Sequence, residues 1–208
     1  MLEPILKRRW SILLSVLVFT YIFDSLAPST LAFEILSRLI YVFVFAGATL
    51  AACLPTHASR FALAAVFTWP LISLLSLLLK TNILAIINVT YTFFILTGAL
   101  IITFYDLSKD KHTKADTMYG SMFGYLLIAF AFALFFLQLE AVQPGSFNFA
   151  KTSVNESALV YFSLVTITTL GYGDITPVSQ VARVAAGLEA ACGVMYVAIF
   201  IGKIISRR

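Results

Sequence analysis

Long apolar runs alternate with short polar segments along the chain. Six of the runs are long enough to cross a bilayer, because a spanning helix needs about 20 apolar residues. They lack the two-residue alternation of membrane-barrel strands, and a helix satisfies its own backbone polar groups in hydrocarbon. The sequence therefore predicts an all-α membrane protein with six transmembrane helices. Their predicted ranges are 10–26, 31–54, 61–79, 83–105, 119–139 and 181–205.

The composition excludes two broad classes of protein. Hydrophobic residues make up 61% of the 208 residues, and charged residues make up 12%. A soluble domain is nearer half apolar and a quarter charged, so a soluble enzyme is not expected. A disordered chain is also excluded, because disordered chains contain few apolar residues and this chain has too many to leave exposed to water.

The placement of Lys and Arg predicts the orientation, because cytoplasmic loops carry an excess of both. With the N-terminus inside, six crossings put ten of the fourteen basic residues on the cytoplasmic side, together with both termini. We expect a multi-pass protein of the plasma (inner) membrane. The basic residues are candidate contacts for anionic lipids rather than for nucleic acid. The ten are Lys7, Arg8, Arg9, Arg60, Lys109, Lys111, Lys114, Lys203, Arg207 and Arg208.

The segment between the fifth and sixth runs does not fit this simple pattern. Its middle, residues 157–167, is apolar and aromatic but too short to span a bilayer. We expect a short re-entrant helix there. Irregular backbone at membrane depth occurs only where protein buries it or water reaches it, so the glycine-containing residues that follow are of interest.

The motif that follows the short helix is Thr169, Leu170, Gly171, Tyr172 and Gly173. An ion that sheds its water needs replacement oxygens, and backbone carbonyls supply them when successive carbonyls face one side. That arrangement needs unusual backbone angles at alternate residues, which glycine adopts without steric cost. The motif resembles the selectivity filter of potassium channels. The resemblance implies that K+ binds at Thr169, Leu170, Gly171 and Tyr172.

The resemblance to the tetrameric potassium-channel pore extends over about residues 119–206. It implies an outer helix, a re-entrant pore helix, a filter loop and an inner helix in each subunit. One loop supplies one wall of a pore, and the chain contains no second copy of the motif. A homotetramer is therefore expected. Apart from the K+ ions in the filter, no cofactor is expected.

Three residues near the motif are candidate filter supports, namely Thr168, Val165 and Asp174. Some bacterial channels of this family have a glutamate in place of Val165, and it interacts with the aspartate after the filter. Because valine cannot do so, we expect Asp174 to lose that partner. Leu170 is a second departure, since valine or isoleucine is commoner there, and it changes the packing behind the filter.

The last helix carries the gating candidates. Gly193 lies 22 residues beyond Gly171, where the resemblance implies a hinge, although glycine also serves close packing between membrane helices. Val197, Ile201 and Ile205 follow at helical spacing and form an apolar stripe that can gate by dewetting. Packing against lipid or other helices would explain the same stripe.

Glu189 is an acidic residue inside the last predicted spanning helix. A buried carboxylate is costly unless it is paired or protonated. One interpretation makes Glu189 a pore-tuning residue that acts through pH or charge. The other makes it a strut, hydrogen-bonded to hydroxyl groups behind the pore helix.

The chain divides by composition into three parts. Residues 1–105 are predicted as a four-helix transmembrane domain that resembles a voltage-sensor domain, residues 106–118 as a solvated cytoplasmic linker, and residues 119–208 as the pore domain. A voltage sensor needs several Arg or Lys at regular spacing on its fourth helix, and residues 83–105 contain none. We therefore expect no intrinsic voltage gating.

Together these features favour a potassium-selective channel that conducts K+ passively. The alternatives are a weakly selective cation channel, a secondary transporter and a membrane enzyme. Transporters usually show paired halves with broken helices, and no second half matches the filter here. His57 and His112 lie in predicted loops without an acid or nucleophile pattern around them, so no enzymatic activity is expected.

Overall fold

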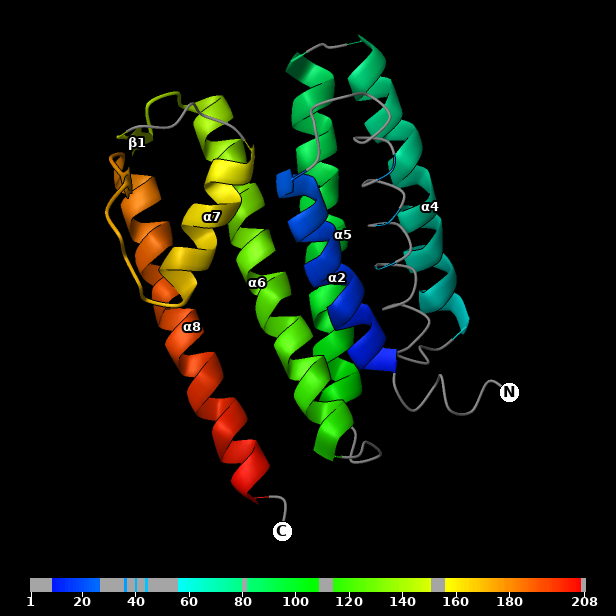
Figure 1. The fold of residues 1–208 in the computed structure, drawn as a ribbon. Coiled ribbons are helices and arrows are strands. Elements are labelled where there is room, and N and C mark those ends of the chain that lie inside the picture. The colour runs from blue at the N-terminus through cyan, green and yellow to red at the C-terminus, as the bar shows by residue number, and fades with distance from the viewer. Residues whose placement is uncertain are drawn as a thin grey trace. The chain divides into compact units, whose positions relative to one another are not determined.

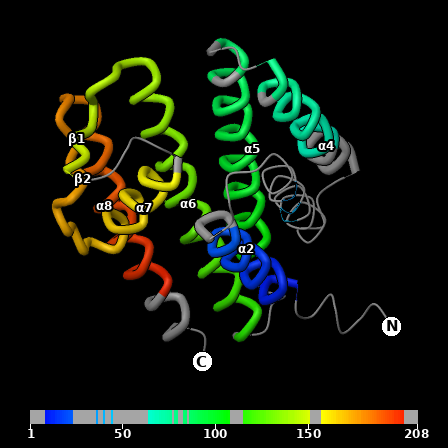
Figure 2. Tube along the Cα trace, turned by 45° about the horizontal axis from the view of Figure 1, so that its top comes forward, coloured from blue at the N-terminus to red at the C-terminus, as the bar shows by residue number. Residues whose placement is uncertain are grey.

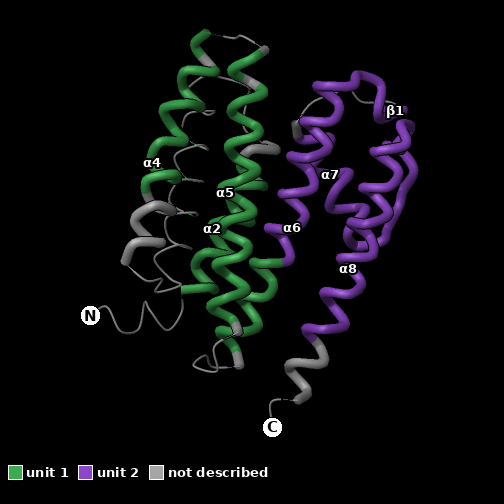
Figure 3. The backbone as a smooth tube through the Cα atoms, turned by 180° about the vertical axis from the view of Figure 1, so that it is seen from behind, with its two compact units in different colours: residues 1–124 green, residues 125–208 purple. Residues whose placement is uncertain are grey.

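The computed structural model describes residues 9–26, 36, 40, 44, 56–79, 82–108, 114–150 and 156–206. These residues form two compact units, Met1–Gly124 and Tyr125–Arg208, which are coloured separately in Figure 3. In chain order the elements are α2 (Arg9–Leu26), α4 (Thr56–Leu79), α5 (Asn82–Ser108), α6 (Lys114–Val142), β1 (Phe147–Phe149), α7 (Glu156–Ile167), β2 (Ile175–Pro177) and α8 (Gln180–Ser206), drawn in Figure 1.

Five of the six predicted spans coincide with helices in the described residues, namely α2, α4, α5, α6 and α8. The second predicted span, 31–54, lies outside the described residues except at positions 36, 40 and 44. By length and composition, three described helices can cross a membrane: Ile86–Leu107, Ala115–Val142 and Gln180–Phe200. The predominantly helical fold is confirmed, and six crossings stay a prediction.

In the first unit, polar side chains join α4 to α5. The Trp69 indole Nε1 donates to Thr92 Oγ1 at 2.8 Å, and the hydroxyls of Thr68 and Tyr91 are hydrogen-bonded at 2.7 Å. Hydrogen bonds of this kind hold helices together in lipid, where apolar faces gain nothing by leaving the hydrocarbon. Helix α4 continues through Pro70.

The polar stretch at 106–118 is more helical than its composition predicts. Helix α5 runs to Ser108 and α6 begins at Lys114, and Asp106 and Asp116 are buried. Asp106 forms a 2.8 Å ion pair with Arg9 of α2. Asp106 and Asp116, near the ends of the segment, are therefore not solvated, whereas residues 109–113 lie outside the described residues. The partner of Asp106 lies 97 positions away in the sequence, so the composition of the segment does not reveal it. The boundary between the compact units also falls later, after Gly124.

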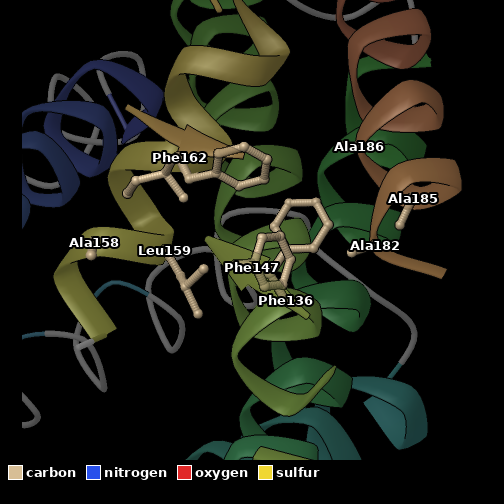
Figure 4. Close-up of a cluster of buried hydrophobic side chains, with 9 residues drawn as sticks. Phe136, Phe147, Ala158, Leu159, Phe162, Ala182, Ala185 and Ala186 are labelled. Atoms are coloured by element: carbon tan, nitrogen blue, oxygen red, sulfur yellow. The ribbon is translucent and has the colours of Figure 1, made fainter. Parts of the chain in front are cut away.

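The core of the second unit is built around three phenylalanine rings, shown in Figure 4. Phe136 of α6, Phe147 of β1 and Phe162 of α7 lie with each pair of ring centroids 5.3 Å apart, in edge-to-face geometry. Such pairs are worth about 0.5–1.5 kcal/mol beyond their buried area. Alanines of α8 line the other side of the cluster and let that helix approach closely: Ala182, Ala185 and Ala186.

A small antiparallel pair of strands accompanies the helices, which the sequence analysis did not anticipate. Strands β1 and β2 pair in the register Phe147 with Pro177 and Phe149 with Ile175. Figure 2 shows the two strands next to each other. Beyond the strands, the Ala150 amide donates to the carbonyl of Asp174 at 3.1 Å. Three-residue strands have no periodic pattern to read, so the sequence did not reveal them.

Candidate functional site

The candidate site begins where α7 ends. The Leu170 amide donates to the Val165 carbonyl and the Thr169 amide donates to the Thr166 carbonyl, both at 2.9 Å. This pair of bonds is the Schellman termination of a helix, in which the residue after the cap is left-handed. Thr169 holds that position with φ of 60°, where glycine is usual. The first residue of the predicted filter is therefore also the residue that stops the short helix.

Left-handed backbone recurs at every second residue of the predicted filter. Thr169, Gly171 and Gly173 have φ values of 60°, 56° and 78°. Alternating backbone angles of this kind are what the filter hypothesis requires, and glycine adopts them without cost. The sequence analysis anticipated the two glycines but not Thr169. A β-branched residue in this conformation costs roughly 1–2 kcal/mol, which the helix-ending hydrogen bonds help to offset.

Side chains fix the filter loop from the side of α7. The Thr168 hydroxyl donates back to the Leu164 carbonyl at 2.6 Å. The Tyr125 hydroxyl, from α6, donates to the carbonyl of Ile167 at 2.9 Å. Val165 is buried on the same helix. Tyr125 is a neighbour of the site that the sequence analysis missed, because 42 positions separate it from Ile167.

Asp174 has a neighbour on α7 that the comparison at position 165 did not reveal. The side chain of Tyr161, one helical turn before Val165, lies close enough to Asp174 to interact with it electrostatically. The sequence analysis considered only position 165 as the source of a partner. On α7, positions 161 and 165 lie on the same face because they are four residues apart. The main chain of Asp174 is also held, through its carbonyl and the amide of Ala150.

Glu140 has a structural role next to the site. Its carboxylate accepts hydrogen bonds from the backbone amides of Gly145, at 2.8 Å, and Phe147, at 3.1 Å. It thereby fixes the turn that leads into β1. Because β1 pairs with β2 directly after the filter, this turn helps to position the outer end of the loop.

The filter loop itself has little protein against it within one chain. Leu170 and Tyr172 are 58% and 67% exposed. A Cβ atom added to Gly171 or Gly173 would meet nothing within 4 Å. Within a single chain, most of the Tyr172 side chain is therefore left uncovered.

Gly193 lies against the end of α7. A Cβ atom at this position would be 2.1 Å from the carbonyl oxygen of Ile167 and 2.9 Å from its Cγ1 atom. No side chain can occupy that space unless the helices move apart. Of the two interpretations of Gly193, this contact supports close packing between helices.

One turn earlier on α8, Glu189 is fully buried beside α7. Its Oε1 atom is in hydrogen-bond contact with the hydroxyl of Ser163, which also lies 2.6 Å from the carbonyl oxygen of Ala129 in α6. This is the geometry that the strut interpretation describes. The contacts join the three long elements of the unit behind the filter.

The remaining gating candidates are only partly described. Val197 is 44% exposed on α8. The side chains of Ile201 and Ile205 lie outside the described residues, although the helix includes both positions. The structure thus brings Gly193 and Glu189 to the pore helix and does not connect Val197 with them.

Comparison with known proteins identifies the same part of the chain. Residues 122–207 match the family model described as "Ion channel". The chain is 29% identical over 106 residues to the potassium voltage-gated channel protein shk-1 of Caenorhabditis elegans, and 33% identical over 87 residues to the inward rectifier potassium channel Kirbac3.1 of Paramagnetospirillum magnetotacticum. It is 26% identical over 102 residues to two-pore potassium channel 4 of Arabidopsis thaliana.

These matches cover 47%, 40% and 48% of this chain but only 19%, 26% and 36% of the respective relatives. No solved structure matches the chain. The resemblance to a potassium-channel pore is confirmed, and the matched family and relatives are channels rather than enzymes. Together with the apolar helices, the family match shows a multi-pass membrane protein.

The packing of Gly193 generates a testable prediction. Gly193→Ala should destabilise the protein by about 1–3 kcal/mol, the usual cost of overpacking, and lower its thermal unfolding midpoint in detergent. Gly187→Ala is the matched control, because a Cβ atom there meets nothing within 4 Å and alanine is the better helix former. If both variants unfold at the wild-type temperature, the packing interpretation is wrong and the hinge interpretation is favoured.

Proposed function

We propose that this protein is a potassium-selective channel, in which K+ passes down its gradient through a filter of backbone carbonyls. The observation that carries the proposal is the left-handed backbone at Thr169, Gly171 and Gly173, directly after a short apolar helix. The names of the relatives and the family match support the same function.

Selection of K+ follows from the chemistry of dehydration. An ion that enters a narrow pore exchanges its water shell for other oxygens, and carbonyl dipoles replace that shell for K+. The carbonyls of Thr169, Leu170, Gly171 and Tyr172 are the proposed ligands. Only the backbone of Leu170 would take part, so leucine in place of valine or isoleucine leaves the ligand set unchanged.

We infer that four copies of the chain surround the pore. A single loop forms only one wall, and a closed ring needs identical loops related by rotation. The exposure of Leu170 and Tyr172 supports this inference, because neighbouring copies would cover these side chains. A homotetramer would also cover the exposed apolar side chains of α8, among them Val184, Leu188 and Met195.

The proposed setting is the plasma (inner) membrane, with both termini in the cytoplasm. The excess of Lys and Arg in the segments that this orientation places inside supports it. The same basic residues, apart from Arg9, which is paired with Asp106, are the proposed contacts for anionic lipid headgroups.

Two alternatives remain as outcomes of the test. A weakly selective cation channel would use the same pore with a less rigid filter, since Leu170 and Val165 depart from the commoner residues. A secondary transporter would couple K+ movement to a second gradient. The single filter motif favours a channel over a transporter.

The direct test is ion flux from liposomes that contain the purified full chain, with K+ or Na+ as the only permeant cation. We expect K+ flux along its gradient and at least about tenfold less Na+ flux. Gly171→Ala should lower K+ flux by more than about tenfold, because alanine at a φ of 56° costs roughly 1–2 kcal/mol in every subunit. Gly98→Ala on α5, where a Cβ atom meets nothing within 4 Å, is the matched control and should conduct normally.

Each other outcome selects among the alternatives. Equal K+ and Na+ flux would keep the pore and contradict the selectivity. K+ uptake that requires a proton or sodium gradient would favour the transporter. Normal K+ flux in Gly171→Ala would show that the loop does not conduct.

We also propose that the voltage dependence of opening is weak. Helix α5 contains no Lys or Arg, whereas each elementary charge that moves across the membrane contributes about 2.3 kcal/mol per 100 mV. Conductance in planar bilayers, recorded in symmetrical K+ without divalent cations or polyamines, should therefore change little with voltage. A steep change under these conditions would overturn the proposal.

A further inference from the structure

The hydroxyl of Ser163 makes two short contacts but has only one hydrogen to donate. The Ser163 hydroxyl has one hydrogen and two acceptor lone pairs. It is 2.6 Å from the carbonyl oxygen of Ala129, which can only accept, so its hydrogen points to that carbonyl. The second short contact, with Glu189 Oε1, then needs a hydrogen from the carboxyl group. Glu189 supplies one only if it is protonated.

The surroundings of Glu189 are consistent with a neutral acid. Its side chain is fully buried, and its Oε2 atom has no hydrogen-bond partner among the described residues. The part of the chain that the structure describes also gives it no ion-pair partner. A negative charge would therefore be buried without compensation, which proteins avoid.

The ionisable groups near Glu189 do not supply a positive charge. Tyr125 of α6 is in electrostatic contact with it, but its hydroxyl donates to the Ile167 carbonyl. On α7, Tyr161 interacts with Asp174 instead. On α8 itself, Arg183 is exposed and its Nε atom donates to the backbone at Pro177.

The protonated carboxyl lies in a seam between α7 and α8. Ser163 and Ile167 are four residues apart on α7, and Glu189 and Gly193 are four residues apart on α8. The first pair of facing positions is joined by the hydroxyl–carboxyl contact, and the second by the close approach of Gly193 to the Ile167 carbonyl. Because Ile167 lies two residues before Thr169, the first residue of the proposed filter, the seam fixes the base of the loop.

From this geometry we infer that Glu189 is a neutral carboxylic acid that donates a hydrogen bond to Ser163 and thereby positions the pore helix beneath the selectivity filter. The inference deepens the proposed function, on which its transport consequences rest. Glu189 and Ser163 are positioning residues that act through α7 and do not touch the ion. Loss of the hydrogen bond frees the pore helix to shift. This shift lowers the selectivity for K+ over Na+ more than it lowers the K+ flux.

The protonation state has a direct readout that does not depend on transport. We expect the infrared difference spectrum of wild type minus Glu189→Gln, recorded at neutral pH on the full chain, to show the carbonyl stretch of a protonated carboxylic acid. The band should shift in deuterated water. It should also shift in Ser163→Ala, which removes the acceptor. The control difference with Glu140→Gln should lack this band, because Glu140 accepts two backbone hydrogen bonds.

The positioning role is tested by the ratio of K+ to Na+ flux in liposomes. Glu189→Leu should lower the ratio by about tenfold, the factor that one buried hydrogen bond is worth. Glu189→Gln should restore it, since an amide N–H can donate to the same hydroxyl. A neutral acid loses its proton as pH rises, so the wild-type ratio should fall at alkaline pH while that of Glu189→Gln stays constant. Tyr125 is present in both proteins, so its own ionisation cannot produce this difference.

Carboxylate bands in place of the acid band in the first difference spectrum would overturn the inference. So would a wild-type flux ratio that follows the same pH profile as Glu189→Gln. If the wild type conducts no K+ while the acid band is present, the proposed function fails and the protonation state of Glu189 stands.

Discussion

The pore domain depends on how α7 stops. Its last turn closes with the amides of Thr169 and Leu170 bonded back into the helix, which forces Thr169 into left-handed backbone. The loop therefore leaves the helix with a fixed direction and continues with Gly171 and Gly173 in the same left-handed region. At its other end, β2 pairs with β1 within two residues of Gly173. The filter loop is thus held at both ends by backbone hydrogen bonds, whatever its side chains contact.

Much of this architecture was predictable from local sequence. The long apolar runs predicted helices because a spanning helix needs many consecutive apolar residues. The spacing of Gly171 and Gly173 predicted alternating backbone angles, because glycine is the residue that adopts them without strain. These signals are local, and each needs only a few neighbouring positions.

The parts that could not be predicted depend on residues far apart in the sequence. Arg9 pairs with Asp106, and Tyr125 reaches the carbonyl of Ile167. From the placement of charges along the sequence, Arg9 was interpreted as a topology signal and candidate lipid contact, and Asp106 as part of a solvated linker. The partner of Asp174 was missed for a different reason. Position 165 is where the family carries a partner for this aspartate, whereas the neighbour in this chain is Tyr161, one turn away on the same helix.

The most direct test of the central claim is an anomalous-scattering map from crystals of the full chain grown in Rb+, an analogue of K+. The account predicts a row of Rb+ peaks coordinated by the backbone carbonyls of Thr169, Leu170, Gly171 and Tyr172. The absence of peaks at these carbonyls, or Rb+ bound only by carboxylates elsewhere, would contradict it.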